Sequence, residues 1–70
     1  MTEIRAEMVA NVWKVMVAEG TKVAEGDTLF ILESMKMEIP VLVEDPGTVI
    51  SLNVGEGDVV QEGDLLAVVQ

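Results

Sequence analysis

Few side chains in this 70-residue chain can take part in covalent chemistry. The chain contains no cysteine and no histidine, so it lacks a thiolate nucleophile, the usual general base and the usual zinc ligands. The remaining nucleophile candidates are a few hydroxyl groups and three lysines, Lys14, Lys22 and Lys36. Paired carboxylates are available, but a domain of this size has little room for a substrate cleft. We therefore expect a module that presents a group to other proteins rather than an independent enzyme.

The charge balance is strongly acidic and narrows the classes of partner. Thirteen acidic residues outnumber four basic ones, which gives a formal net charge of −9 at pH 7. Nucleic acids and anionic membranes attract basic surfaces, so neither is an expected partner. No apolar run approaches the roughly 18 residues of a transmembrane helix, and the first residues lack the apolar core of a signal peptide. We expect a cytoplasmic protein that is monomeric when free.

The chain contains one structural unit twice. Residues 17–33 read VAEGTKVAEGDTLFILE and residues 54–70 read VGEGDVVQEGDLLAVVQ, with eight identical positions at a shift of 37 residues. Two units are too few for a solenoid, but each can cover the apolar side of the other in a pseudo-twofold sandwich. The sequence therefore predicts one domain over residues 1–70, with both termini at the end opposite Lys36.

Short strands are expected along the whole chain. Val, Ile and Leu dominate between recurring turn signals such as Gly20, Gly26-Asp27 and Pro46-Gly47. This pattern is typical of an all-β fold, here a flattened β-barrel or sandwich of two four-stranded antiparallel sheets. The expected strands are 3–8, 11–17, 21–23, 28–33, 38–43, 48–54, 58–60 and 65–69.

The repeat also suggests which side chains face the core. In the last strand of each half, the expected inward residues are Leu29, Ile31, Leu66 and Val68, and the expected outward ones are Thr28, Phe30, Leu65 and Ala67. In the earlier strand, apolar residues recur with a step of three and then two, which a regular strand does not permit. Either a β-bulge lies there, or Trp13 and Ile50 are the inward pair.

The junction between the two repeats breaks three local rules of stable structure. Pairing the strands on either side places Met35-Lys36 at a two-residue hairpin tip, where Asn-Gly is favoured because both positions need φ > 0. The same pairing sets Glu33 opposite Glu38, an unfavourable like-charge pair. Met37 and Met35 would also be large apolar side chains at an exposed tip. Such violations cluster at functional sites. The alternative is that both methionines point into the barrel and Lys36 is an ordinary solvated lysine.

The junction sequence Glu33-Ser34-Met35-Lys36-Met37-Glu38 resembles the attachment motif of biotinyl domains, usually read as Glu-Ala-Met-Lys-Met. Gly26-Asp27 and Gly47-Thr48-Val49 are also similar to that family, and the resemblance covers nearly the whole chain. Ser34 stands where the family usually has alanine, and its small size should be tolerated. The resemblance is closest to small stand-alone biotinyl or lipoyl attachment proteins, or to the C-terminal carrier domain of larger carboxylases.

This resemblance implies a biotin carboxyl carrier that is not itself an enzyme. A biotin protein ligase would join biotin covalently to Lys36, reading Met35 and Met37, with Glu33, Ser34 and Glu38 as flanking recognition residues. The attached biotin would then carry a carboxyl group between the biotin carboxylase and carboxyltransferase components of a biotin-dependent carboxylase.

Two other functions stay open. Lipoyl domains share the fold but usually carry Asp-Lys-Ala at the tip, so the methionines favour biotin over lipoate. An unmodified β-barrel interaction module, with Lys36 incidental, is the second alternative. Lys14 and Lys22 are expected to be solvated charges. The acids Glu56, Asp58, Glu62 and Asp64 are expected to form a solvated rim, because the repeat lacks a calcium-binding loop.

Overall fold

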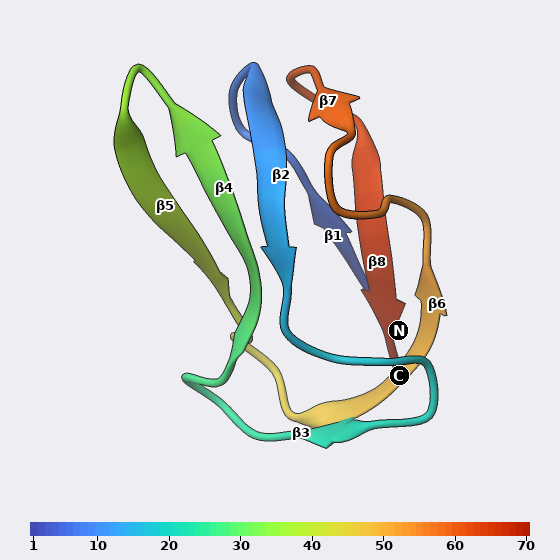
Figure 1. Cartoon of the computed structure of the whole chain (residues 1–70). Helices are drawn as coiled ribbons and strands as arrows, with labels where there is room; N and C mark the ends of the chain where they lie inside the picture. Colours follow the sequence, from blue (N-terminus) through green and yellow to red (C-terminus); the bar gives the residue numbers. More distant parts are fainter.

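The computed structural model describes all residues, 1–70, as two four-stranded antiparallel sheets (Figure 1). The strands are β1 (Thr2–Arg5), β2 (Ala10–Val15), β3 (Lys22–Val23), β4 (Thr28–Ser34), β5 (Met37–Leu42), β6 (Gly47–Leu52), β7 (Val59–Val60) and β8 (Leu65–Val69). The all-β prediction is confirmed, and each expected strand is present with ends that differ by at most three residues. No element is a helix, so no helix could cross a membrane.

The two sheets are related by the internal repeat. Their strand orders are β1-β8-β6-β3 and β5-β4-β2-β7. Adding 37 to the residue numbers of β2, β3 and β4 gives the start of β6, β7 and β8, so each strand of one sheet has its counterpart in the other. The chain ends lie together at the end of the molecule opposite the β4–β5 hairpin, as the sequence predicts (Figure 1).

The glycine turns of each half hydrogen-bond to strands of the other half. The Gly20 N–H donates to the Val49 carbonyl at 2.7 Å, and the equivalent Gly57 N–H donates to the Val12 carbonyl at 2.8 Å. Both glycines adopt positive φ angles, 92° and 93°. Glycine adopts this conformation readily, whereas it is unfavourable for a residue with a side chain. Because these bonds are reciprocal, neither half can complete its own hydrogen bonding alone.

Two glutamates next to these glycines hydrogen-bond to the backbone of the other half, a role that the sequence analysis did not predict. The Glu19 carboxylate accepts a hydrogen bond from the Leu52 N–H, and the Glu56 carboxylate accepts one from the Val15 N–H, both at 3.1 Å. Each thus binds a backbone amide just beyond a strand irregularity in the other half. The signal was present in the sequence, because Glu-Gly recurs at the same place in both repeats.

All four acids of the expected solvated rim are exposed, and three of their carboxylates also accept backbone hydrogen bonds. Besides Glu56, the Asp58 carboxylate accepts from the Gly55 N–H and the Asp64 carboxylate from the Gln61 N–H, both at 2.8 Å. Carboxylates commonly close turns in this way, because they satisfy backbone donors that no strand pairs. Of the four acids, Glu62 is the one without such a bond.

A β-bulge resolves the irregular step in the earlier strand of each half. The register shifts between Val12 and Lys14 in β2, and between Val49 and Ser51 in β6. Val12 and Val49 are buried, whereas Trp13 and Ile50 are each 44% exposed. The bulge is thus correct, and the alternative with Trp13 and Ile50 inward is wrong.

A further bulge makes part of the predicted inward face wrong. Leu29, Leu66 and Val68 are buried as expected, but Phe30 and Ala67 are also fully buried, and Ile31 is only half-buried. The register of β4 against β5 shifts between Thr28 and Phe30, so Leu29 is the extra residue. An inserted residue inverts the alternation that follows it. Beyond the bulge, Phe30 and Leu32 therefore face the core, with Ile31 on the other side.

Candidate functional site

The junction motif forms the hairpin that joins β4 to β5, at the free upper end of the sheet (Figure 1). Ser34 pairs with Met37, which leaves Met35 and Lys36 as the two turn residues. Their φ angles are 53° and 65°, in the left-handed region at both positions, as a type I′ turn requires. These two are the only non-glycine residues of the chain with positive φ. The structure thus places the two-residue turn at Met35-Lys36, as the sequence predicts.

The methionines beside the lysine point away from the core. Met35 is 92% exposed and Met37 is 65% exposed, so the alternative in which they fill the barrel is wrong. Exposed apolar side chains contribute nothing to the stability of the free protein by burial. They are instead available to a protein that docks on the tip, where burial of methionine is favourable and adaptable to shape.

The tip is flanked by the expected carboxylate pair. Glu33 and Glu38 are direct partners across β4 and β5, and both are exposed. Ser34 is half-buried at the last paired position before the turn. No cation neutralises the two carboxylates, since the one salt bridge of the molecule joins Arg5 to Glu3. The hairpin brings all six predicted site residues into one short projection.

Lys36 carries the only amine at this tip. It is exposed and forms neither a salt bridge nor a side-chain hydrogen bond. The other two lysines lie in strands that pair with a neighbour, Lys14 in β2 and Lys22 in β3. The Lys14 ammonium lies 5.4 Å from the centre of the Trp13 ring, within range of a cation–π contact. Lys36 is thus the one lysine that lies in a turn, where no strand pairs beside it.

Two exposed valines outside the motif, Val9 and Val59, lie towards the same end of the molecule as the tip. The β1–β2 connection and β7 reach the same end as the tip (Figure 1). Asn11 of β2 pairs with both Glu33 and Val59, which places Val59 level with the base of the hairpin. Val59 and Val9 are largely exposed. The sequence analysis did not single out these two valines, although an apolar residue next to a turn could have indicated an exposed apolar side chain there.

The sequence and the fold match those of biotin and lipoyl attachment domains. A model of the family described as "Biotin-requiring enzyme", which covers biotin and lipoyl attachment domains, matches residues 2–69. The "Biotinylated protein TB7.3 homolog" of Mycobacterium leprae is 54% identical over 67 residues, which cover 96% of this chain and 94% of that protein. The "Biotin/lipoyl attachment protein" of Bacillus subtilis is 44% identical over 63 residues, 90% and 86% of the two chains.

Solved structures agree with this assignment. The crystal structure of Kluyveromyces lactis urea carboxylase contains a region that superposes with a TM-score of 0.91 at 35% identity. The match covers 99% of this chain but only 6% of that carboxylase. The chain belongs to the biotin and lipoyl attachment domain family.

Proposed function

We propose that this protein is a biotin carrier, with biotin joined through an amide bond to the Nζ atom of Lys36. Family membership and a relative named as biotinylated support the biotin carrier function. The observation that carries the choice of residue is the hairpin tip, where a lysine without polar partners stands between two exposed methionines. A local sequence that costs stability without filling the core is expected at a functional site.

The tip suits covalent attachment for geometric reasons. A biotin protein ligase would present the biotin carboxyl group as an activated acyl adenylate. The neutral Lys36 amine attacks the acyl carbon, the C–N bond forms, adenylate leaves with the bonding electrons, and the amine loses a proton. The ligase has to reach the amine from several sides, and a two-residue turn leaves no neighbouring strand beside Lys36. Met35 and Met37 are the apolar contacts that we assign to ligase recognition, with Glu33, Ser34 and Glu38 around them.

The attached biotin would carry a carboxyl group, and the protein would deliver it. We propose that the partners are the biotin carboxylase and carboxyltransferase components of a carboxylase, because similar domains form small parts of urea carboxylase and pyruvate carboxylase. Biotin supplies the carboxyl-transfer chemistry, while the chain holds and positions it. The protein itself would be non-catalytic, in keeping with its lack of histidine and cysteine.

Intact-mass measurement separates biotin from lipoate and from an unmodified module. The protein is produced with an active biotin ligase and, separately, with an active lipoate ligase, each with its cofactor supplied. We expect one biotin per chain in the first case and little or no lipoate in the second. Addition of lipoate but not of biotin would show that the protein is a lipoyl carrier instead of a biotin carrier. An unmodified mass in both cases would support an interaction module.

A further inference from the structure

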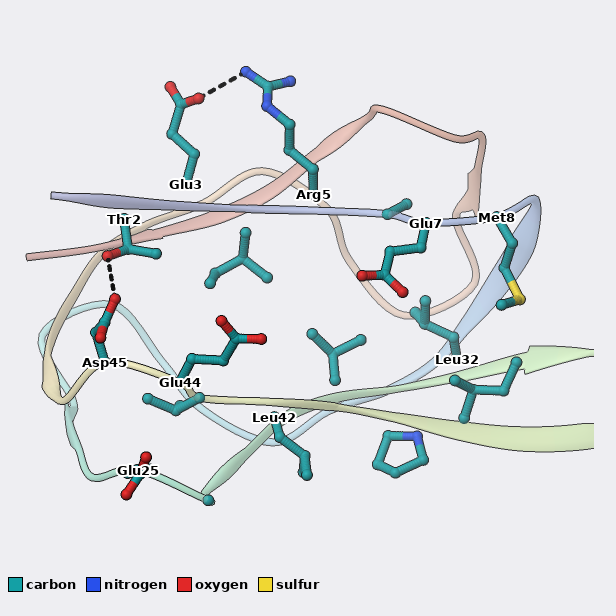
Figure 2. A pocket seen from close by; sticks show the side chains of 17 residues that line it. Thr2, Glu3, Arg5, Glu7, Met8, Glu25, Leu32, Leu42, Glu44 and Asp45 are labelled. Carbon is teal, nitrogen blue, oxygen red and sulfur yellow. Dashed lines mark hydrogen bonds and ion pairs between the residues drawn. The ribbon is translucent and has the colours of Figure 1, made fainter.

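The two sheets do not meet along one side of the molecule, where β1 and β5 face each other across a groove (Figure 2). Each of these strands is the last in its sheet, so each has one edge without a strand partner. The groove has a volume of about 1040 Å³, at the upper end of the range for ligand pockets. At one end, the Thr2 hydroxyl donates to the Asp45 carboxylate at 3.4 Å and bridges the two walls.

The floor of the groove is apolar. Ile4 of β1, and Ile39 and Val41 of β5, line it and pack against the core while staying only partly buried. Apolar side chains in this state gain free energy when a further apolar group covers them, by about 25 cal/mol for each Å² removed from water. The groove therefore favours an occupant with apolar side chains on one side.

The charges around the groove are almost all negative. The lining residues include five acids: Glu3, Glu7, Glu25, Glu44 and Asp45. Figure 2 shows the Glu7 and Glu44 side chains directed into the gap from opposite walls. Arg5 is the only basic residue of the lining, and its guanidinium forms a salt bridge with Glu3 at 2.9 Å on the side away from the gap. An occupant with Lys or Arg side chains would match this surface.

The two edges differ in their capacity to accept another strand. Pro40 stands in the middle of β5 and has no N–H, so it removes a donor from that strand. Proline in a sheet is found on edge strands, with the nitrogen side facing away from the ladder. The repeat places Glu3 of β1 at the position equivalent to Pro40: Glu3 pairs with Val68 as Pro40 pairs with Ile31. The edge of β1 thus keeps the N–H that β5 lacks.

We propose that this groove binds an extended segment of a partner protein that alternates apolar and basic residues. The segment adds to β1 as a further antiparallel or parallel strand, a known mode of peptide recognition. Its apolar side chains cover Ile4, Ile39 and Val41, and its basic ones approach Glu7 and Glu44. A second copy of this chain is a poor occupant, because two grooves of the same sign in chains of net charge −9 repel each other. The site leaves Lys36 free, so the partner tethers the carrier without blocking its tip.

The test is a titration of the unmodified, isotope-labelled protein, followed by amide NMR shifts. The probe is the capped peptide Lys-Val-Lys-Val-Lys, and the control probe is capped Glu-Val-Glu-Val-Glu, each added up to a few millimolar. We expect shifts confined to residues 2–8, β5 and residues 43–45, with the lysine peptide only, and weaker binding as salt is added. No shifts with the lysine peptide, equal shifts with both peptides, or shifts centred on Trp13 would each overturn the proposal.

Two matched pairs of variants then separate strand addition from charge. Glu3→Pro removes the N–H of β1, and Glu3→Gln removes the same charge but keeps the N–H. We expect peptide binding to be roughly tenfold weaker in Glu3→Pro than in Glu3→Gln. Glu44→Lys should weaken binding by a similar factor, while Glu62→Lys, outside the groove with the same change in net charge, should have a much smaller effect.

Each pair of variants can overturn the proposal. Equal affinities of the two Glu3 variants would exclude strand addition to β1, and equal affinities of the two lysine variants would exclude recognition by the groove acids. Dispersed amide spectra serve as the check that each variant is folded, and the comparison of Glu44→Lys with Glu62→Lys remains decisive even if Glu3→Pro does not fold. Sedimentation that reveals a dimer of the wild type, lost in Glu3→Pro, would make a second copy the occupant and overturn the proposal.

Discussion

Met35 and Lys36 adopt the backbone conformation that asparagine and glycine adopt at a lower free-energy cost. A left-handed conformation costs an ordinary L-residue about 1–2 kcal/mol. The residue types at this turn therefore lower the stability of the fold. Both side chains are exposed, so their burial contributes nothing to the stability of the free protein. The motif is consistent with selection for what a modifying enzyme recognises rather than for the turn itself.

Replacing the turn by its favoured residues should therefore stabilise the protein while it removes the proposed site. We expect the double variant Met35→Asn/Lys36→Gly to raise the free energy of unfolding by about 1 kcal/mol in urea denaturation. The control is Lys36→Ala, which removes the amine but keeps the backbone strain, and should change stability by less than about 0.5 kcal/mol. An unfolding midpoint that does not rise in the double variant would show that the turn is unstrained.

At the scale of the strands, bulges decide which residues form the core. The number of the strands and their places along the chain followed from the spacing of glycines and valines, and the position of the hairpin tip followed from the repeat boundary. The order of the strands within each sheet was not predicted. The faces of β4 did not follow from the spacing either, because the bulge at Leu29 inverts the alternation and brings Phe30 inward. Apolar residues occupy both faces there, so periodicity alone could not locate the extra residue. The groove between β1 and β5 could not be predicted either, because it depends on how the two sheets pack against each other, which the pattern within each strand does not contain.

The corrected face of β4 makes a prediction opposite to that of the sequence. Phe30→Ala should lower the free energy of unfolding by about 3–5 kcal/mol, because a fully buried ring leaves a cavity. Ile31→Ala, at a half-buried position, should cost clearly less. Urea unfolding of the two variants checks this, and a larger loss for Ile31→Ala would mean that the bulge is misplaced.

The carboxylates that bind backbone amides across the halves give a second prediction at this scale. Glu19→Ala and Glu56→Ala should each destabilise the protein by about 1 kcal/mol, since each leaves a backbone N–H without its acceptor. The corresponding glutamine variants keep an acceptor oxygen and should lose less. Glu62→Ala is the matched control, because Glu62 makes no such bond. Thermal or urea unfolding compares the five variants, and equal stability of all five would contradict this account of the turns.

For the molecule as a whole, net charge is the dominant long-range term. Thirteen acids and four basic residues share a molecule of 31 × 18 × 17 Å, with a single salt bridge between them. Repulsion among like charges disfavours the compact state, and it is screened over about 8 Å at 0.15 M salt. We expect the melting temperature to rise from low salt to about 0.15 M sodium chloride. A melting temperature that stays flat or falls over this range would contradict a stability limited by charge repulsion.

The shape of the molecule fits a carrier with one working end. The lysine tip and the chain termini lie at opposite ends of the molecule (Figure 1). The groove lies between β1 and β5, along the side of the molecule. A partner held in the groove and an enzyme at the tip could therefore bind at the same time. Peptide binding in the groove should leave the rate of biotin addition unchanged, which a ligase assay with and without the lysine peptide measures. Inhibition by the peptide would mean that the two surfaces overlap.

The most direct test is to map the modified residue in protein produced with an active biotin ligase. Wild type, Lys36→Arg, and a variant in which Met35 and Lys36 exchange places are compared by intact mass and peptide mapping. Arginine keeps the charge but cannot serve as the amine nucleophile, and the exchange re-aims the amine while changing the flanking residues. The wild type should gain one biotin, on Lys36, and both variants should gain none while remaining folded. Full biotin labelling of Lys36→Arg at Lys14 or Lys22 would contradict the assignment of the site.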